Sequence, residues 1–386
     1  MDSYYKVSSC YNRSSGSMMS LYSDKVVKVF DADNNCTIRK LPVDGKQAVV
    51  NVEAGITTVL GDSKIVAAFH ERSAVAAGDK VNVIDAADKA GAVVKSVNVE
   101  HGSQATQLHK FKESCMIVSG SQGNSNVHDV RRDNDVVMTW KGAKYAVPDE
   151  ASERLVYNVT QRKVDGKQRL CLQSHDVRYV PEVGYFQGRP QYCMPHSMRA
   201  DLPGQPTGAI AVCGKYVLYG YTDAADRDGA PGVRVYDMSS PAERDNTHHA
   251  DLEMPRQGRA VDDMEVCGMS TVRLRARPDA LREICVVVTR RYLLVYAMAD
   301  VNDAIAAAER CKVRPIRVID LAAELEKTLK EDCRDGRVTS VVFGDAHDEP
   351  RMHMTCMGTD AVIIDLDETF LNCQQPHDDG KKQGRE

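Results

Sequence analysis

A short strand-like pattern recurs along the whole chain and limits the possible folds more than any other feature. It reads Val-x-Val, then an aromatic residue or Ile, then Asp, as in Val233-Arg234-Val235-Tyr236-Asp237. Two copies are looser, and one ends on Ala instead of Asp. The seven copies end at Asp31, Asp85, Asp129, Asp176, Asp237, Ala297 and Asp365.

The spacing of the copies predicts the architecture. Successive copies end 54, 44, 47, 61, 60 and 68 residues apart. A period of roughly 40–50 residues with one strand signature per unit is typical of the blades of a β-propeller. One blade cannot bury its apolar face alone, so the units must close into a ring to make a core. The repeat therefore predicts an all-β fold, a seven-bladed propeller. Each Asp is expected to cap the turn that follows its strand.

Length and composition agree with this prediction. The chain has 386 residues, which leaves about 50 for each blade of a seven-bladed ring. Apolar residues make up 42% of the chain, but aromatic residues only 6%. Val, Ile and Ala must therefore fill most of the core, and β-branched side chains suit strands.

Charge and cysteine content narrow the function classes. The net charge of −5 argues against broad nucleic-acid binding, which usually needs a basic stripe. The twelve cysteines include no C-x-x-C pair, so we expect reduced thiols and no zinc ribbon. The first residues contain no apolar signal segment, and the apolar runs are strand-sized. We expect a cytoplasmic and/or nuclear protein, not secreted, with no transmembrane segment, cofactor or metal.

The two ends of the chain indicate how the ring closes. Before Asp31 there is room for three strands, at about residues 4–10, 17–22 and 25–31. After the last copy comes one more apolar piece, Thr369-Phe370-Leu371-Asn372-Cys373. We predict that this piece completes the first blade, which would remove an open sheet edge. The propeller would then span residues 1–373, and residues 374–386 would form a disordered polar tail.

Two helix-like segments interrupt the strand rhythm between the sixth and seventh copies. Residues 303–310 are rich in helix formers. Residues 320–332 read as a second helix, with Asp320 as N-cap and Leu321, Leu325 and Leu329 on one face. We predict a small helical insertion at about residues 300–333. Its Leu stripe is expected to pack on the propeller, and a partner-binding groove is the alternative.

One segment resembles a known repeat family. Residues 116–131, Met-Ile-Val-Ser-Gly-Ser-Gln-Gly-Asn-Ser-Asn-Val-His-Asp-Val-Arg, are similar to a WD40 repeat (WD repeat). The other copies resemble the strand ending of that repeat, with Phe, Ile, His or Tyr where Trp is usual. No Trp-Asp or Gly-His dipeptide occurs, so the hydrogen-bond network typical of that family is largely missing.

The resemblance implies a function as well as a fold. Propellers of this family are rigid platforms that bind other proteins through rims and loops inside multiprotein complexes. We therefore expect a non-catalytic scaffold for protein–protein interaction whose partners are other proteins of a complex. Nucleic acid and membrane lipid are less favoured partners.

One motif carries possible catalytic chemistry. Asp365-Leu366-Asp367-Glu368-Thr369 resembles the D-x-D-x-T motif of haloacid-dehalogenase-type phosphatases, in which Asp365 would be the nucleophile and Asp367 the acid/base. Only 17 residues follow Thr369, whereas that fold needs its lysine and metal-binding acids downstream. We interpret the motif as a coincidence of the last blade and predict no catalytic residues.

Two basic groups are candidate contacts for an anionic ligand or partner. Arg290 and Arg291 are similar to the paired arginines of autophagy-type propellers, which bind phosphoinositides, although there Gly follows the pair and here Tyr292 does. This resemblance supplies the alternative function, a propeller that binds phosphoinositides at a membrane surface. Arg273, Arg275 and Arg277 alternate along a predicted strand and form the second group. Solvated turns and faces are the alternative interpretation of both groups.

Overall fold

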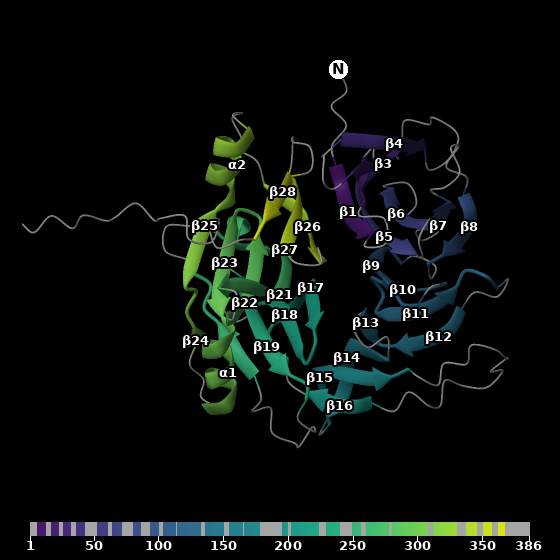
Figure 1. Cartoon of the computed structure of the whole chain (residues 1–386). Coiled ribbons are helices and arrows are strands. Elements are labelled where there is room, and N and C mark those ends of the chain that lie inside the picture. Colours follow the sequence, from purple (N-terminus) through teal and green to yellow (C-terminus); the bar gives the residue numbers. More distant parts are fainter. Residues whose placement is uncertain are drawn as a thin grey trace, which may run out of the picture.

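The computed structural model describes the chain as a series of strands and helices with the turns that join some of them (Figure 1). The described residues are 6–12, 17–22, 26–31, 36–42, 52–60, 64–71, 80–85, 93–99, 103–112, 114–132, 136–149, 154–164, 166–177, 195–199, 202–223, 229–239, 249–255, 260–277, 280–307, 312–329, 337–345, 350–356 and 362–366.

The described strands form seven sheets, antiparallel except for one short strand pair in the fifth, and the first four sheets each have four strands in chain order. The first holds β1 (Lys6–Asn12), β2 (Ser17–Tyr22), β3 (Val26–Asp31) and β4 (Cys36–Pro42). The second holds β5 (Val52–Leu60), β6 (Lys64–Glu71), β7 (Lys80–Asp85) and β8 (Val93–Asn98). The third holds β9 (Ala105–Lys110), β10 (Cys115–Gly120), β11 (Asn124–Asp129) and β12 (Val136–Lys141). The fourth holds β13 (Ala143–Pro148), β14 (Leu155–Val164), β15 (Lys167–Asp176) and β16 (Pro195–Arg199).

The last three sheets vary this plan. The fifth holds β17 (Gln205–Cys213), β18 (Tyr216–Thr222), β19 (Pro231–Asp237), β20 (His249–Leu252) and the short parallel strand β24 (Lys312–Val313). The sixth holds β21 (Val266–Arg277), β22 (Ala280–Thr289), β23 (Tyr292–Ala297) and β25 (Arg317–Asp320), and a 3-10 turn, η1 (Asp262–Met264), precedes it. The seventh has three strands in the described residues, β26 (Val338–Asp345), β27 (Pro350–Cys356) and β28 (Val362–Asp365).

Every copy of the recurring sequence pattern occupies the same position in its sheet. Each of the seven copies is the third strand of its sheet: β3, β7, β11, β15, β19, β23 and β28. The apolar run that precedes most copies is the second strand, paired antiparallel to it, as β10 is to β11. The predicted seven-bladed, all-β propeller is therefore confirmed, with one copy of the pattern in each blade.

The first strands of the sheets contact one another in ring order. The sequence of contacts runs β1, β5, β9, β13, β17, β21, β26, and β26 contacts β1 again. Figure 1 shows the purple N-terminal sheet beside the yellow C-terminal sheet at this closure. Closing the ring in this way gives each sheet a neighbour on both faces, which one blade alone lacks.

The first sheet has four strands from the N-terminal part of the chain. Its fourth strand, β4, directly follows the third strand in sequence. A strand from the same hairpin closes a much shorter loop than one recruited from the far end of the chain, so it loses less entropy. Residues 369–373 and the predicted tail 374–386 lie outside the described residues.

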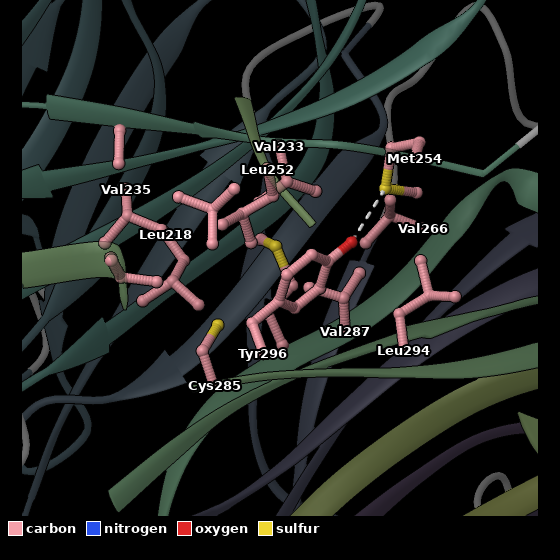
Figure 2. Packing of buried hydrophobic residues seen from close by; sticks show 14 of the residues in the cluster. Leu218, Val233, Val235, Leu252, Met254, Val266, Cys285, Val287, Leu294 and Tyr296 are labelled. Atoms are coloured by element: carbon pink, nitrogen blue, oxygen red, sulfur yellow. Dashed lines mark hydrogen bonds between the residues drawn. The ribbon is translucent and has the colours of Figure 1, made fainter. Parts of the chain in front are cut away.

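Among the described side chains, apolar residues fill five of the spaces between consecutive sheets. The largest cluster lies between the fifth and sixth sheets and includes Leu218, Val235, Cys285, Val287 and Tyr296 (Figure 2). The Tyr296 hydroxyl donates to the main-chain oxygen of Glu253 at 2.9 Å, so this buried ring also has a polar partner. Similar clusters lie between the second and third, third and fourth, fourth and fifth, and sixth and seventh sheets. Each fully buried Val or Leu contributes about 1.5–3 kcal/mol, so these interfaces hold the ring together.

The predicted helical insertion is present, with a different start for its first helix. Helix α1 (Met298–Ala307) begins directly after β23, five residues before the predicted start at residue 303. Met298, Val301 and Ile305 form its buried stripe. The Tyr216 hydroxyl of the fifth sheet donates to Asn302 at 2.6 Å. Helix α1 therefore packs across the fifth and sixth sheets.

The second helix packs in the same manner one interface further along the ring. Helix α2 (Leu321–Leu329) places Leu321 and Leu325 in the cluster between the sixth and seventh sheets. The expectation that the Leu stripe packs on the propeller is confirmed for these two residues. The side chain of Leu329 is outside the described part.

Candidate functional site

The paired arginines lie in the tight turn between β22 and β23, where the sixth sheet meets the seventh. Thr289 shapes this turn, because its hydroxyl oxygen accepts hydrogen bonds from the main-chain N–H groups of Arg291 (3.3 Å) and Tyr292 (2.9 Å). The Thr289 side chain is fully buried. The turn is therefore held in one conformation by a buried hydroxyl.

The main chain of the turn joins three other segments. The N–H of Arg290 donates to the oxygen of Glu265 (2.9 Å), next to η1. The oxygen of Arg290 accepts from Val338 of β26 (2.7 Å), and that of Arg291 accepts from Leu321 of α2 (2.8 Å). The turn thus connects the sixth sheet to the seventh sheet and to the helical insertion.

The side chains of the turn form a cluster of alternating charges. The Arg291 guanidinium donates to both carboxylate oxygens of Asp320, with Nη2–Oδ2 at 3.0 Å, and lies 3.8 Å from Asp263. Asp263 also pairs with Arg337 at 3.7 Å, and Arg290 pairs with Glu265 at 2.5 Å. The hydrogen bond from Arg291 to Asp320 raises the pKa of Arg291. We call this set the junction cluster: Asp263, Glu265, Arg290, Arg291, Asp320 and Arg337.

The junction cluster has three acidic and three basic members, so its formal charge is zero. A phosphate group would therefore have to compete with Asp320 and Asp263 for Arg291, and with Glu265 for Arg290. Bidentate arginine–carboxylate pairs are among the stronger ion pairs in proteins. In this geometry Arg290 and Arg291 connect elements of the fold.

The second basic group lies at the opposite end of the same hairpin. Arg273, Arg275 and Arg277 lie in β21 toward its turn, because Arg277 pairs with Ala280, whereas the junction cluster borders the Val266 end of the strand. Arg273 is largely exposed and lies 3.6 Å from Glu283, its partner in the strand register. The side chains of Arg275 and Arg277 are not among those described. The structure therefore does not bring the two basic groups into one site.

The aspartates that end the repeat have the expected turn-capping role where their contacts are described. The Asp129 carboxylate accepts from the N–H of Arg131 at 3.1 Å, and the Asp237 carboxylate accepts from the N–H of Ser239 at 2.8 Å. Asp176 is half-buried at the end of β15. Asp31 and Asp85 end β3 and β7, and their side chains are outside the described part.

The phosphatase-like motif lies on the last strand of the seventh sheet. The Asp365 carboxylate accepts a hydrogen bond from Arg351 Nε at 2.9 Å, across the strand pair β27–β28. Asp367 and Thr369 lie outside the described residues. Among the residues whose positions are given, no three His, Cys, Asp or Glu side chains come close enough together to hold a metal ion. Of the helices in the described residues, α1 and α2, neither is long and apolar enough to cross a membrane.

Sequence reasoning identified half of the junction cluster. Arg290 and Arg291 were candidates, and Asp320 was predicted as a helix N-cap, but Asp263, Glu265 and Arg337 were not singled out. The run Asp262-Asp263-Met264-Glu265 is a concentrated acidic segment just before a strand, and it was the available signal. Its pairing with a turn that follows a long hairpin depends on the tertiary fold.

No protein-family model matches the sequence, and no curated protein matches it. Solved structures do match the fold. KlHsv2 with loop 6CD replaced by a Gly-Ser linker is 9% identical, with a TM-score of 0.53 over 92% of this chain and 90% of that chain. The β-propeller domain of Cps50 (Swd1) from Myceliophteria thermophila is 11% identical, with a TM-score of 0.44 over 74% and 79% of the two chains. At such low identity the likeness concerns the fold alone, and with the ring of seven sheets it identifies this chain as a β-propeller.

Proposed function

We propose that this protein is a non-catalytic propeller scaffold that binds other proteins within a multiprotein complex in the cytoplasm and/or nucleus. The fold is compatible with many functions, so the proposal depends on the surface that the ring presents. The observation that carries it is a set of exposed valines on the outermost strands of two neighbouring sheets.

The exposed valines lie at equivalent positions. β8 and β12 are the last strands of the second and third sheets in the described residues, and both begin with Val-Val. Val93, Val94 and Val136 are 38%, 52% and 41% exposed. Val93 pairs with Ile84 and Val136 with His128, the residues just before Asp85 and Asp129 in the two repeats.

One hydrogen bond joins β8 to the turn that leads from β11 toward β12. The Lys95 ammonium of β8 donates to the main-chain oxygen of Arg132, in the turn that follows β11. In the fifth sheet the outer edge of the fourth strand, β20, is covered, because β24 pairs with it and α1 packs beside it. The second and third sheets thus present main-chain edges flanked by apolar side chains.

An extended apolar segment of another protein is the partner that fits these edges. Such a segment adds a strand to an open sheet edge, with main-chain hydrogen bonds for affinity and apolar side chains for specificity. The apolar clusters between the sheets keep the edges fixed relative to each other. A rigid edge loses little conformational entropy on binding, which favours affinity.

The test is gentle purification of the tagged protein from its own cells, followed by mass spectrometry of the proteins recovered with it. We expect near-stoichiometric partners that are lost from the Val94→Glu and Val136→Glu variants. Val261→Glu is the matched control, because Val261 is 41% exposed but precedes η1 at the sixth sheet. All three changes are at exposed positions, so the melting temperature should stay the same.

Different results separate the parts of the proposal. Partners that remain on all three variants would leave the scaffold function intact and reject the β8 and β12 edges. Absence of any partner would reject the scaffold function. Flotation with phosphoinositide vesicles would then test the alternative, lipid binding at Arg290 and Arg291.

A further inference from the structure

Polar side chains are concentrated at the interface between the third and fourth sheets. On the third sheet, Ser119, Ser125 and Trp140 form a row across β10, β11 and β12, because each is the register partner of the next. On the fourth sheet, Asn158 of β14 pairs directly with Gln173 of β15. Residues paired in this way point to the same face of a sheet.

Hydrogen bonds show that the two rows face each other. The Ser119 hydroxyl accepts from the N–H of Ala146 (3.2 Å), which is the register partner of Asn158. The Ser125 hydroxyl donates to the main-chain oxygen of Ala143 (3.0 Å) and lies 2.9 Å from the Ser119 hydroxyl. The two serines are therefore bonded to each other and to the first strand of the next sheet.

Four more polar side chains of this interface have buried atoms for which the described residues supply no hydrogen-bond partner. Asn158 and Gln173 are 0% exposed, and Thr160 and Trp140 are almost completely buried. In the part of the chain that the structure describes, no hydrogen-bond partner is found for the amide O or N of Asn158 and Gln173, the Thr160 hydroxyl or the Trp140 indole nitrogen. Buried polar atoms without partners are strongly destabilising, so native proteins satisfy nearly all of them.

We propose that this interface is a binding site for a small cluster of internal water molecules, held by Trp140, Asn158, Thr160 and Gln173. The six atoms comprise three N–H donor groups, two carbonyl acceptors and one hydroxyl, and none carries a formal charge. This mixture matches water, which donates and accepts, and does not match an ion. A buried water makes about three hydrogen bonds, so about two molecules satisfy the six atoms.

The competing arrangement is a direct bond between the two amides. Asn158 and Gln173 are cross-strand neighbours, so a change of side-chain rotamer could bring Nδ2 of one to Oε1 of the other. That arrangement would leave less room for water between the sheets. It predicts that the two amides satisfy each other and that the interface is dry.

The experiment is oxygen-17 magnetic relaxation dispersion, which counts water molecules that exchange slowly from a protein interior, together with a high-resolution crystal structure. We expect the Asn158→Leu/Gln173→Met double variant to lose about two slowly exchanging waters relative to wild type. Asn82→Leu is the matched control. Asn82 is also buried on a third strand, but its carbonyl accepts from the Ser96 hydroxyl at 2.7 Å, so the water count should not change.

Two conservative single variants keep the test valid if the double variant does not fold. Thr160→Val and Trp140→Phe each remove one of the six polar atoms with little change in shape, and each should lower the count by about one or leave one water more mobile. An unchanged dispersion in these variants and in the double variant would overturn the proposal. So would electron density that shows Asn158 bonded directly to Gln173 with no water between the sheets.

Discussion

Single side chains at the ends of the repeated strands stabilise turns by accepting hydrogen bonds. At Asp129, burial alone would raise the carboxyl pKa, but hydrogen bonds from Arg131 and the charges of Arg131 and Arg132 outweigh it, and the pKa is lowered. Asp237 has the same balance, with Lys215 and Ser239 as its partners. In both cases the charged carboxylate stabilises the fold. This stability is complete above the pKa that the carboxyl has in the unfolded chain, and it is lost as the pH falls through the lower pKa of the folded state.

A buried histidine makes the seventh sheet sensitive to acid. Burial, with a smaller contribution from the charge of Arg351, lowers the pKa of His353 to about 4, against 6.5 in the unfolded chain. Between these values the unfolded chain binds a proton that the folded chain does not. The stability that depends on neutral His353 is therefore complete above about pH 6.5 and is lost as the pH falls toward 4.

We predict that His353→Leu removes this part of the acid sensitivity. Between pH 7 and pH 4, the free energy of unfolding of wild type should fall by about 3 kcal/mol more than that of the variant. Urea denaturation at several pH values measures the difference. Val261→Leu, at an exposed position just before η1, changes no titratable group and should keep the wild-type slope. Parallel pH profiles for wild type and His353→Leu would contradict the prediction.

At the scale of elements, the second helix depends on a cap that is shared with the neighbouring turn. Asp320 accepts hydrogen bonds from the N–H groups of Ala322 (3.1 Å) and Ala323 (3.4 Å), as its predicted N-cap role requires. The same carboxylate pairs with Arg291. One residue thus fixes the start of α2 and its position beside the sixth sheet.

We predict that Asp320→Ala lowers the free energy of unfolding by about 1–2 kcal/mol, because it removes both the cap and a half-exposed ion pair. Asp320→Asn is the control, since its amide oxygen can still cap the helix, and it should cost about 0.5 kcal/mol. Chemical denaturation measures both values, and a double-mutant cycle with Arg291→Met isolates the ion pair. Equal effects of Ala and Asn would mean that the cap contributes nothing.

At the scale of the whole molecule, stability depends on closure of the ring. The first sheet contacts the second through β1 and β5, and the seventh through β1, β26 and β27. Its removal would leave each of these neighbours without a sheet on one face. The strands that close the ring come from opposite ends of the sequence, so both ends must be in place before the last interface forms.

We predict that deletion of residues 1–42, the whole first sheet, leaves a chain without a cooperative thermal transition. Deletion of residues 374–386, the predicted tail, is the matched control and should leave the melting temperature unchanged. Calorimetry measures both. A shortened chain that still melts cooperatively at the wild-type temperature would show that six sheets form a stable ring without the first.

The sequence determined the features that depend on local pattern. The seven third strands, the second strands paired with them, and the cap of α2 follow from alternation, spacing and residue type within short windows. The tertiary structure decided features that depend on distant residues. Met298 starts α1 because its side chain becomes buried between the fifth and sixth sheets.

The same distinction applies to the candidate sites. The sequence singled out Arg290 and Arg291 by their charge, but only the fold brought Asp263 and Asp320 to Arg291. The sequence contained no signal for Asn158 and Gln173. Each is a polar residue that follows an apolar residue along its strand, as many solvent-exposed residues do. Their burial follows from the packing of the next sheet over that face, and contacts between sheets are not encoded in any short stretch of the chain.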